Sequence, residues 1–73
     1  MKPEVLDGLI KDILKQFNNC SSGVINIITT KHDYTLNPDT DEYSVSREDG
    51  IILLETQTGT KFISCDAVTA IEI

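Results

Sequence analysis

The chain has few of the side chains on which enzymes and metal sites depend. Among 73 residues it has one histidine, two cysteines and no tryptophan. A nucleophile needs a base within hydrogen-bond reach, and structural zinc needs four closely placed ligands. His32 stands alone beside Asp33 at a predicted strand bend, where a solvated turn residue is the simpler interpretation. We therefore expect no enzyme activity, no catalytic residue, no metal and no cofactor.

Long apolar runs are also missing, the longest being Ile51–Leu54. A membrane-spanning helix needs about 20 apolar residues, and a secretory signal needs an uninterrupted apolar stretch of its own. The first residues are instead interrupted by charges. We expect no membrane association and a cytoplasmic location, where thiols stay reduced. A Cys20–Cys65 disulfide is possible, but free cysteines are the expectation.

Basic residues are scarce, with six Lys and Arg against twelve Asp and Glu and a net charge of −6. The imbalance lies in residues 24–73, which hold nine acidic residues against three basic ones. Nucleic-acid affinity comes mainly from Lys and Arg contacts to phosphates. No basic cluster is visible, so the acidic part favours solubility or a basic protein partner over an ordinary RNA surface.

One amphipathic helix is predicted over residues 3–18. Pro3 suits the first turn, and apolar residues recur with helical spacing on one face, whereas Asp7 and Lys11 lie opposite. The segment 18–23 is rich in Asn, Ser and Gly and should end the helix. The apolar face consists of Val5, Leu6, Leu9, Ile10, Ile13, Leu14 and Phe17.

From residue 24 onward the pattern changes to short strands separated by turn residues. The chain should form one domain over 1–73, with a mainly β fold: a small, strongly bent, five-stranded antiparallel barrel after the N-terminal helix. We expect 34–36 to continue the first strand past a bend at 31–33. The predicted strands are 24–36, 42–47, 51–56, 61–64 and 67–73.

The last predicted strand is apolar and lies at a sheet edge, where its unpaired backbone groups invite pairing with another chain. A 73-residue chain also has a small core, and small domains often gain stability by oligomerisation. Both points predict a homo-oligomer. A head-to-tail contact that closes on itself would give a ring.

The stretch 63–71, Ile-Ser-Cys-Asp-Ala-Val-Thr-Ala-Ile, resembles the second signature of the Sm-like family, which includes Hfq and the LSm proteins. Ile63, Val68 and Ile71 keep its apolar positions, and Val45–Glu55 aligns with the Hfq-like stretch that precedes it. The resemblance implies a bent barrel and a homo-oligomeric ring joined through its last strands. The interface residues that follow are Phe62, Ile63, Val68, Ala70 and Ile71.

The same resemblance implies RNA as a partner, through atypical and acidic pocket positions. Gly50 occupies the place of the family's base-stacking residue, and Asp66 occupies that of a histidine in Hfq. Two functions stay open: a ring that contacts RNA, or a structural, protein-interacting oligomer that binds no RNA. By resemblance, the RNA-binding residues would be Arg47, Glu48, Asp49, Gly50, Cys65 and Asp66.

Overall fold

The structure is a computed structural model that describes residues 1–19 and 23–73. One α-helix precedes six short strands and one 3₁₀ turn. Cys20, one half of the possible disulfide, lies outside the described residues. The elements are α1 (Pro3–Asn19), β1 (Ile25–Thr29), β2 (Asp33–Leu36), β3 (Glu42–Ser46), β4 (Ile51–Thr56), β5 (Gly59–Ser64), the 3₁₀ turn η1 (Cys65–Ala67) and β6 (Val68–Glu72).

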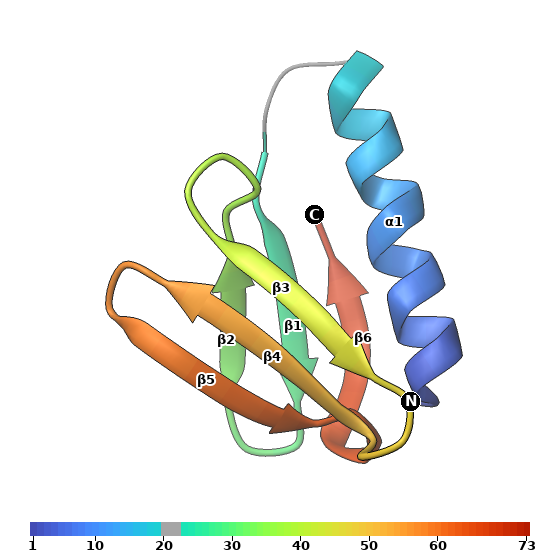
Figure 1. Cartoon of the computed structure of the whole chain (residues 1–73). Coiled ribbons are helices and arrows are strands. Elements are labelled where there is room, and N and C mark those ends of the chain that lie inside the picture. Colours follow the sequence, from blue (N-terminus) through green and yellow to red (C-terminus); the bar gives the residue numbers. More distant parts are fainter. Residues whose placement is uncertain (20–22) are drawn as a thin grey trace.

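The strands form two antiparallel sheets of three strands each. Sheet A has the order β2-β1-β6, and sheet B has the order β3-β4-β5. Sheet B lies in front of sheet A in Figure 1, and α1 runs alongside on the side of β6 and the end of β3. The side formed by β2 and β5 carries no helix. The fold is thus a two-layer arrangement with a helix along one side only.

The predicted strongly bent, five-stranded barrel is wrong, because the described residues form six strands in two sheets that share no strand and do not close. The error lies in residues 24–36, which form the hairpin β1–β2 instead of one bent strand. Thr29 makes this reversal favourable: its N–H donates to the carbonyl of His32 at 3.0 Å, and its Oγ1 accepts from the N–H of His32 at 3.0 Å. A side-chain hydroxyl that satisfies turn amides stabilises a sharp reversal over a gradual bend.

The predicted turn at residues 37–41 is present and separates β2 from β3. The Asn37 carbonyl accepts from the N–H groups of Thr40 and Asp41, at 3.1 and 2.8 Å. Asn37 Oδ1 accepts from the N–H of Asp39, and Asp41 Oδ2 accepts from the N–H of Asn37. Because side chains satisfy these backbone groups, the chain leaves sheet A here and enters sheet B as a new strand.

The core between the layers is entirely aliphatic apart from one cysteine. Strand residues that point inward alternate with exposed ones, as in β4, where Ile52 and Leu54 are buried and Glu55 is exposed. No polar or charged side chain is buried among the described residues. The buried residues are Leu6, Ile10, Ile25, Ile27, Leu36, Ile52, Leu54, Ile63, Cys65 and Val68.

The last strand departs from the alternation that its sequence predicts. Val68 is buried and Ile71 also packs against the core, although an odd number of steps separates them. The pairing of β6 with β1 shifts register between Ile28 and Thr29, and this irregularity returns both side chains to the inner face. The same shift places Ala70 opposite Ile28, away from the core.

Helix α1 is anchored by apolar contacts and by one charged residue. Leu6 and Ile10 are fully buried, whereas Leu9 is 39% exposed. At the side of the helix near β3, the Asp7 carboxylate pairs with Lys11 at 3.0 Å and with Arg47 at 3.9 Å. Exposed ion pairs contribute about 0–1 kcal/mol, so the buried side chains dominate helix docking.

We expect Ile10→Ala to lower the free energy of unfolding by about 2–4 kcal/mol, because it leaves a cavity under α1. Leu9→Ala is the matched control, since it removes the same number of carbon atoms from a partly exposed site, and should cost less than about 1 kcal/mol. Urea denaturation followed by circular dichroism measures both. Equal losses for the two variants would contradict the packing described here.

Candidate binding surfaces

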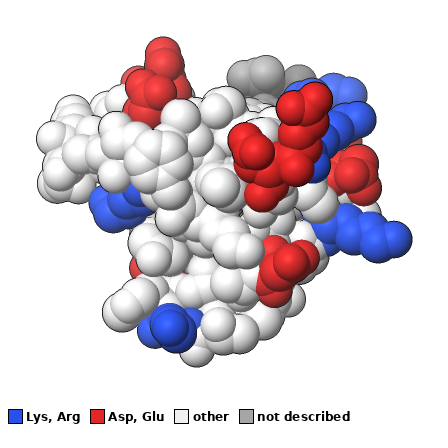
Figure 2. All heavy atoms as spheres, turned by 60° about the horizontal axis from the view of Figure 1, so that its bottom comes forward, with Lys and Arg blue, Asp and Glu red and all other residues white. Residues whose placement is uncertain are grey.

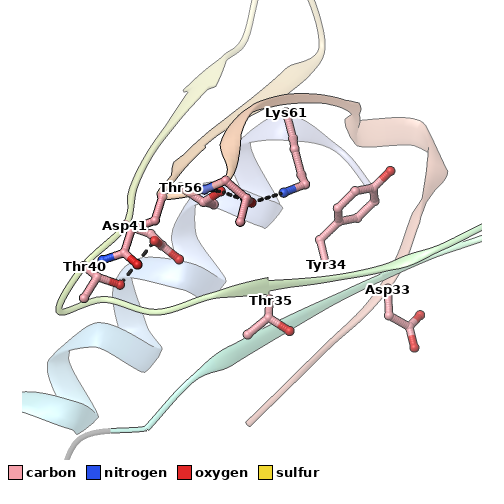
Figure 3. A pocket seen from close by; sticks show the side chains of 9 residues that line it. Asp33, Tyr34, Thr35, Thr40, Asp41, Thr56 and Lys61 are labelled. Carbon is pink, nitrogen blue, oxygen red and sulfur yellow. Dashed lines mark hydrogen bonds between the residues drawn. The ribbon is translucent and has the colours of Figure 1, made fainter.

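The side of the molecule without a helix contains a polar cleft between sheet A and sheet B. Its main hollow has a volume of about 390 Å³. β2 contributes one wall, and the β4–β5 hairpin with Lys61 contributes the other (Figure 3). We call it the open cleft. Its lining residues are Asp33, Tyr34, Thr35, Thr40, Asp41, Thr56, Gln57, Thr58 and Lys61.

Lys61 and Tyr34 reach into the open cleft from opposite walls, as Figure 3 shows. Lys61 lies opposite Leu54 on the inward-facing side of β5, so its stem lies along the inner edge of the sheet and its ammonium extends into the cleft. Its Nζ donates to Thr58 Oγ1 at 3.3 Å. The ion pairs of the described residues involve Lys11 and Arg47, so the ammonium of Lys61 has no carboxylate partner.

The two carboxylates at the open cleft are placed differently from Lys61. Asp41 accepts from the N–H of Asn37 at 2.9 Å and from the hydroxyl of Thr40 at 3.2 Å, so it is engaged in the turn. In Figure 3 the side chain of Asp33 points to the other side of β2 from Tyr34. The cleft therefore presents an unpaired cation, a phenol and several hydroxyls.

A second hollow of about 220 Å³ adjoins the open cleft, with Tyr34 lining both. His32 packs edge-on against Tyr34, with ring centroids 6.3 Å apart. His32 is exposed, which agrees with its interpretation as a turn residue. Lys31 also lines this hollow, so the rim on this side carries two lysines.

A second surface is apolar and lies on the outer face of sheet B. Phe62 is 73% exposed and stands directly opposite Leu53, which in turn stands opposite Ser44. A hollow of about 180 Å³ adjoins Phe62, lined by Ser44, Ser46, Asp49, Ile51, Leu53 and Phe62. We call this the Phe62 face.

The five residues expected at an oligomer interface are distributed unevenly. Ile63 and Val68 are buried in the core, and Ile71 packs against it. Ala70 is half-buried on β6. Phe62 alone of the five projects into solvent, because the alternation of β5 sends it outward while Ile63 points inward.

The six positions expected to bind RNA come together at one end of the molecule. Arg47–Gly50 form the β3–β4 turn, and Cys65 and Asp66 lie in η1. The carbonyl of Gly50 accepts from the N–H of Cys65 at 2.8 Å, which joins the two segments. Cys65 itself is fully buried.

The charge of that region does not favour phosphate. One cation, Arg47, stands among Glu48, Asp49 and Asp66, and it lies 3.9 Å from the Asp7 carboxylate. Figure 2 shows Lys and Arg at separate points of this side of the molecule, without a continuous basic area. Phosphate binding relies on clustered cations.

Burial also determines the chemistry of two ionisable groups. It raises the pKa of the Cys65 thiol above its ordinary value of 9.0, and Asp66 adds to the effect while the Met1 amino group opposes it. The pKa of the Tyr43 phenol is raised by burial and by Asp7. Because the thiolate is the reactive form, Cys65 should be a poor nucleophile.

Sequence reasoning did not identify Tyr34 and Lys61 as neighbours. Neither residue is among the predicted binding or interface residues. A usable signal existed: Lys61 occupies an inward position in the alternation of β5, which is unusual for lysine. Their juxtaposition depends on the separation of β2 from β1, which the expected bent strand concealed.

No protein-family model, curated protein or solved structure matches this chain. Among the described residues, no group of three or more His, Cys, Asp or Glu could hold a metal ion. No helix in the described part of the chain combines the length and apolar character needed to cross a membrane. The function is therefore inferred from the surfaces described above.

We expect the Cys65 thiol to react with Ellman's reagent at pH 8 at least about tenfold more slowly in the folded protein than in urea, since reaction requires opening of the core. A Cys20→Ser variant leaves Cys65 as the single thiol for this measurement. Reaction at the same rate in both conditions would show that Cys65 is accessible.

The raised pKa of Cys65 also predicts a pH dependence of stability. The unfolded chain loses the thiol proton first as pH rises, so stability is full below about pH 9 and declines above it. Urea denaturation at pH 8 and pH 10 measures the decline. Cys65→Ala should reduce the loss of unfolding free energy between pH 8 and pH 10, even if the variant is less stable overall. The same loss in the variant would show that groups other than Cys65 cause it.

Proposed function

We propose that this protein is a non-enzymatic, protein-interaction module that forms a homo-oligomer through the Phe62 face. The exposure of Phe62 is the observation that carries the proposal. Full burial of a Phe side chain is worth about 1.5–3 kcal/mol, and an exposed aromatic beside half-buried Ile51 and Leu53 provides the apolar centre that protein interfaces use.

The chemistry around Phe62 suits contact with protein. Ser44 and Ser46 border the apolar residues and carry no charge, so they cost less to desolvate than charged side chains would. Glu42 and Glu55 stand opposite each other one row away, at the margin of the face. The three carboxylates of the face, Asp49 in the hollow and Glu42 and Glu55 one row away, are all exposed, so salt can screen the repulsion between copies of charge −6.

The arrangement of strands also supports self-association. β5 and β6 are edge strands of different sheets; α1 runs alongside β6, so the outer edge of β5 is the more accessible of the two. Pairing of two different edges in successive copies is a head-to-tail contact, which gives a ring if it closes. The proposal is self-association through the Phe62 face; closure of the oligomer into a ring is a more specific hypothesis within it.

RNA binding stays a prediction of the family resemblance and is not part of this proposal. The positions expected to bind RNA carry three acidic side chains and one basic side chain, and one of their members, Cys65, is buried. No feature of the described surface favours phosphate over a protein partner.

Sedimentation equilibrium at 1–100 μM tests the proposal. We expect the wild-type chain to associate and Phe62→Ser to weaken the association about tenfold or more, the amount that follows from loss of a buried aromatic contact. Val24→Ser is the control, since Val24 is 40% exposed and precedes β1, away from the outer face of sheet B. A wild-type monomer across this range would overturn the proposal.

The salt dependence of binding separates this proposal from RNA binding. Self-association of copies with charge −6 should strengthen between 50 and 500 mM NaCl, because salt screens their repulsion. Binding to uridine- or adenine-rich RNA through Arg47 or Lys61 would weaken over the same range. Fluorescence anisotropy with labelled RNA measures the second effect, and Arg47→Glu tests whether any RNA signal involves the predicted turn.

A further inference from the structure

We propose that the open cleft binds an extended peptide segment of a partner protein and that Lys61 and Tyr34 hold a carboxylate side chain of that segment. This inference does not rest on self-association, because it concerns the side of the molecule between β2 and β5 and not the outer face of sheet B.

The first support is the state of the Lys61 ammonium. It carries three N–H donors, and within the described residues it makes one hydrogen bond, to Thr58 Oγ1 at 3.3 Å, and no ion pair. Lys61 is half-buried, and within the described residues no anion pairs with the ammonium that it extends into the cleft. An incoming carboxylate would supply that anion.

The second support is the position of Tyr34. In Figure 3 its ring rises from β2 toward Lys61, and no hydrogen bond joins its hydroxyl to another cleft residue. A carboxylate offers two oxygens, so one group can accept from the ammonium of Lys61 and from the phenol of Tyr34 together. The nearby carboxylate of Asp41 is already hydrogen-bonded within its turn and does not take this role.

The third support is the free edge of β2, which selects a peptide over a small anion. β2 pairs with β1 only. The N–H of Thr29 bonds to the carbonyl of His32, and hydrogen-bonded and non-bonded pairs alternate along an antiparallel ladder. The backbone groups of Asp33 and Thr35 therefore point to the free edge, where an added strand can pair with them.

The charge of the cleft agrees with an acidic partner. Across the open cleft and the adjoining hollow, Lys31 and Lys61 balance Asp33 and Asp41, in a chain whose net charge is −6. This side is thus locally neutral, so an acidic segment meets less repulsion here than the net charge of the chain would suggest. One contact between Lys61 and a carboxylate then gives peptides with Glu or Asp a higher affinity than peptides with a neutral side chain at that position.

Nuclear magnetic resonance titration of the ¹⁵N-labelled full chain tests the proposal, with the blocked peptide acetyl-Thr-Glu-Val-amide as probe. We expect saturable shifts of the Asp33 and Thr35 amides. Replacement of Glu by Gln in the peptide, or Lys61→Met in the protein, should raise the dissociation constant about tenfold, because each removes one partner of the charge-assisted contact. Tyr34→Phe should produce a smaller increase.

Lys15→Met is the matched control, because it removes an exposed lysine from α1, and should leave the dissociation constant unchanged. Equal binding of the Glu and Gln peptides, an unchanged dissociation constant for Lys61→Met, or absence of saturable shifts would each overturn the proposal. Inorganic phosphate that binds as tightly as the peptide would do so too, since the site would then recognise only an anion. Ser44→Asp places a charge on the Phe62 face and lies outside both hollows of this side, so it should bind the peptide like the wild type; loss of self-association and loss of peptide binding are thereby distinguished.

Discussion

The packing of α1 against one side of the two sheets is the interaction on which the rest of the structure depends. Two three-stranded sheets of four to six residues per strand bury few side chains, and α1 adds Leu6 and Ile10 to a core of ten residues. A sheet pair of this size is expected to be marginal without such cover. The helix also determines which side is occupied, and thereby which side is left for ligands.

Sequence reasoning located the elements whose signals are local. The helical spacing of apolar residues predicted a helix over 3–18, and the structure has α1 at Pro3–Asn19. The turn residues at 37–41 and near Gly50 and Gly59 marked real breaks, and both glycines adopt positive φ angles. The strand predicted at 51–56 is β4 (Ile51–Thr56), which forms the centre of sheet B.

The errors arose where a hydrogen bond or a pairing register, and not hydropathy, decided the outcome. Whether 24–36 bends or reverses depends on Thr29 and His32, whose hydrogen bonds do not appear in a hydropathy pattern. The positions of Val68 and Ile71 depend on a register shift against β1. The cleft residues Tyr34 and Lys61 belong to different sheets, so no spacing rule could bring them together.

The helix covers the two sheets on one side only, and this affects how they can move relative to each other. The helix lies along the β6 side, whereas β2 and β5 face each other across solvent with no strand between them (Figure 1). A small rotation of one sheet against the other about the helix side would change the width of the gap while every ladder hydrogen bond remains intact. Such a rotation would expose the half-buried Tyr34 and Lys61 first, whereas Leu6 and Ile10 of the helix would stay buried.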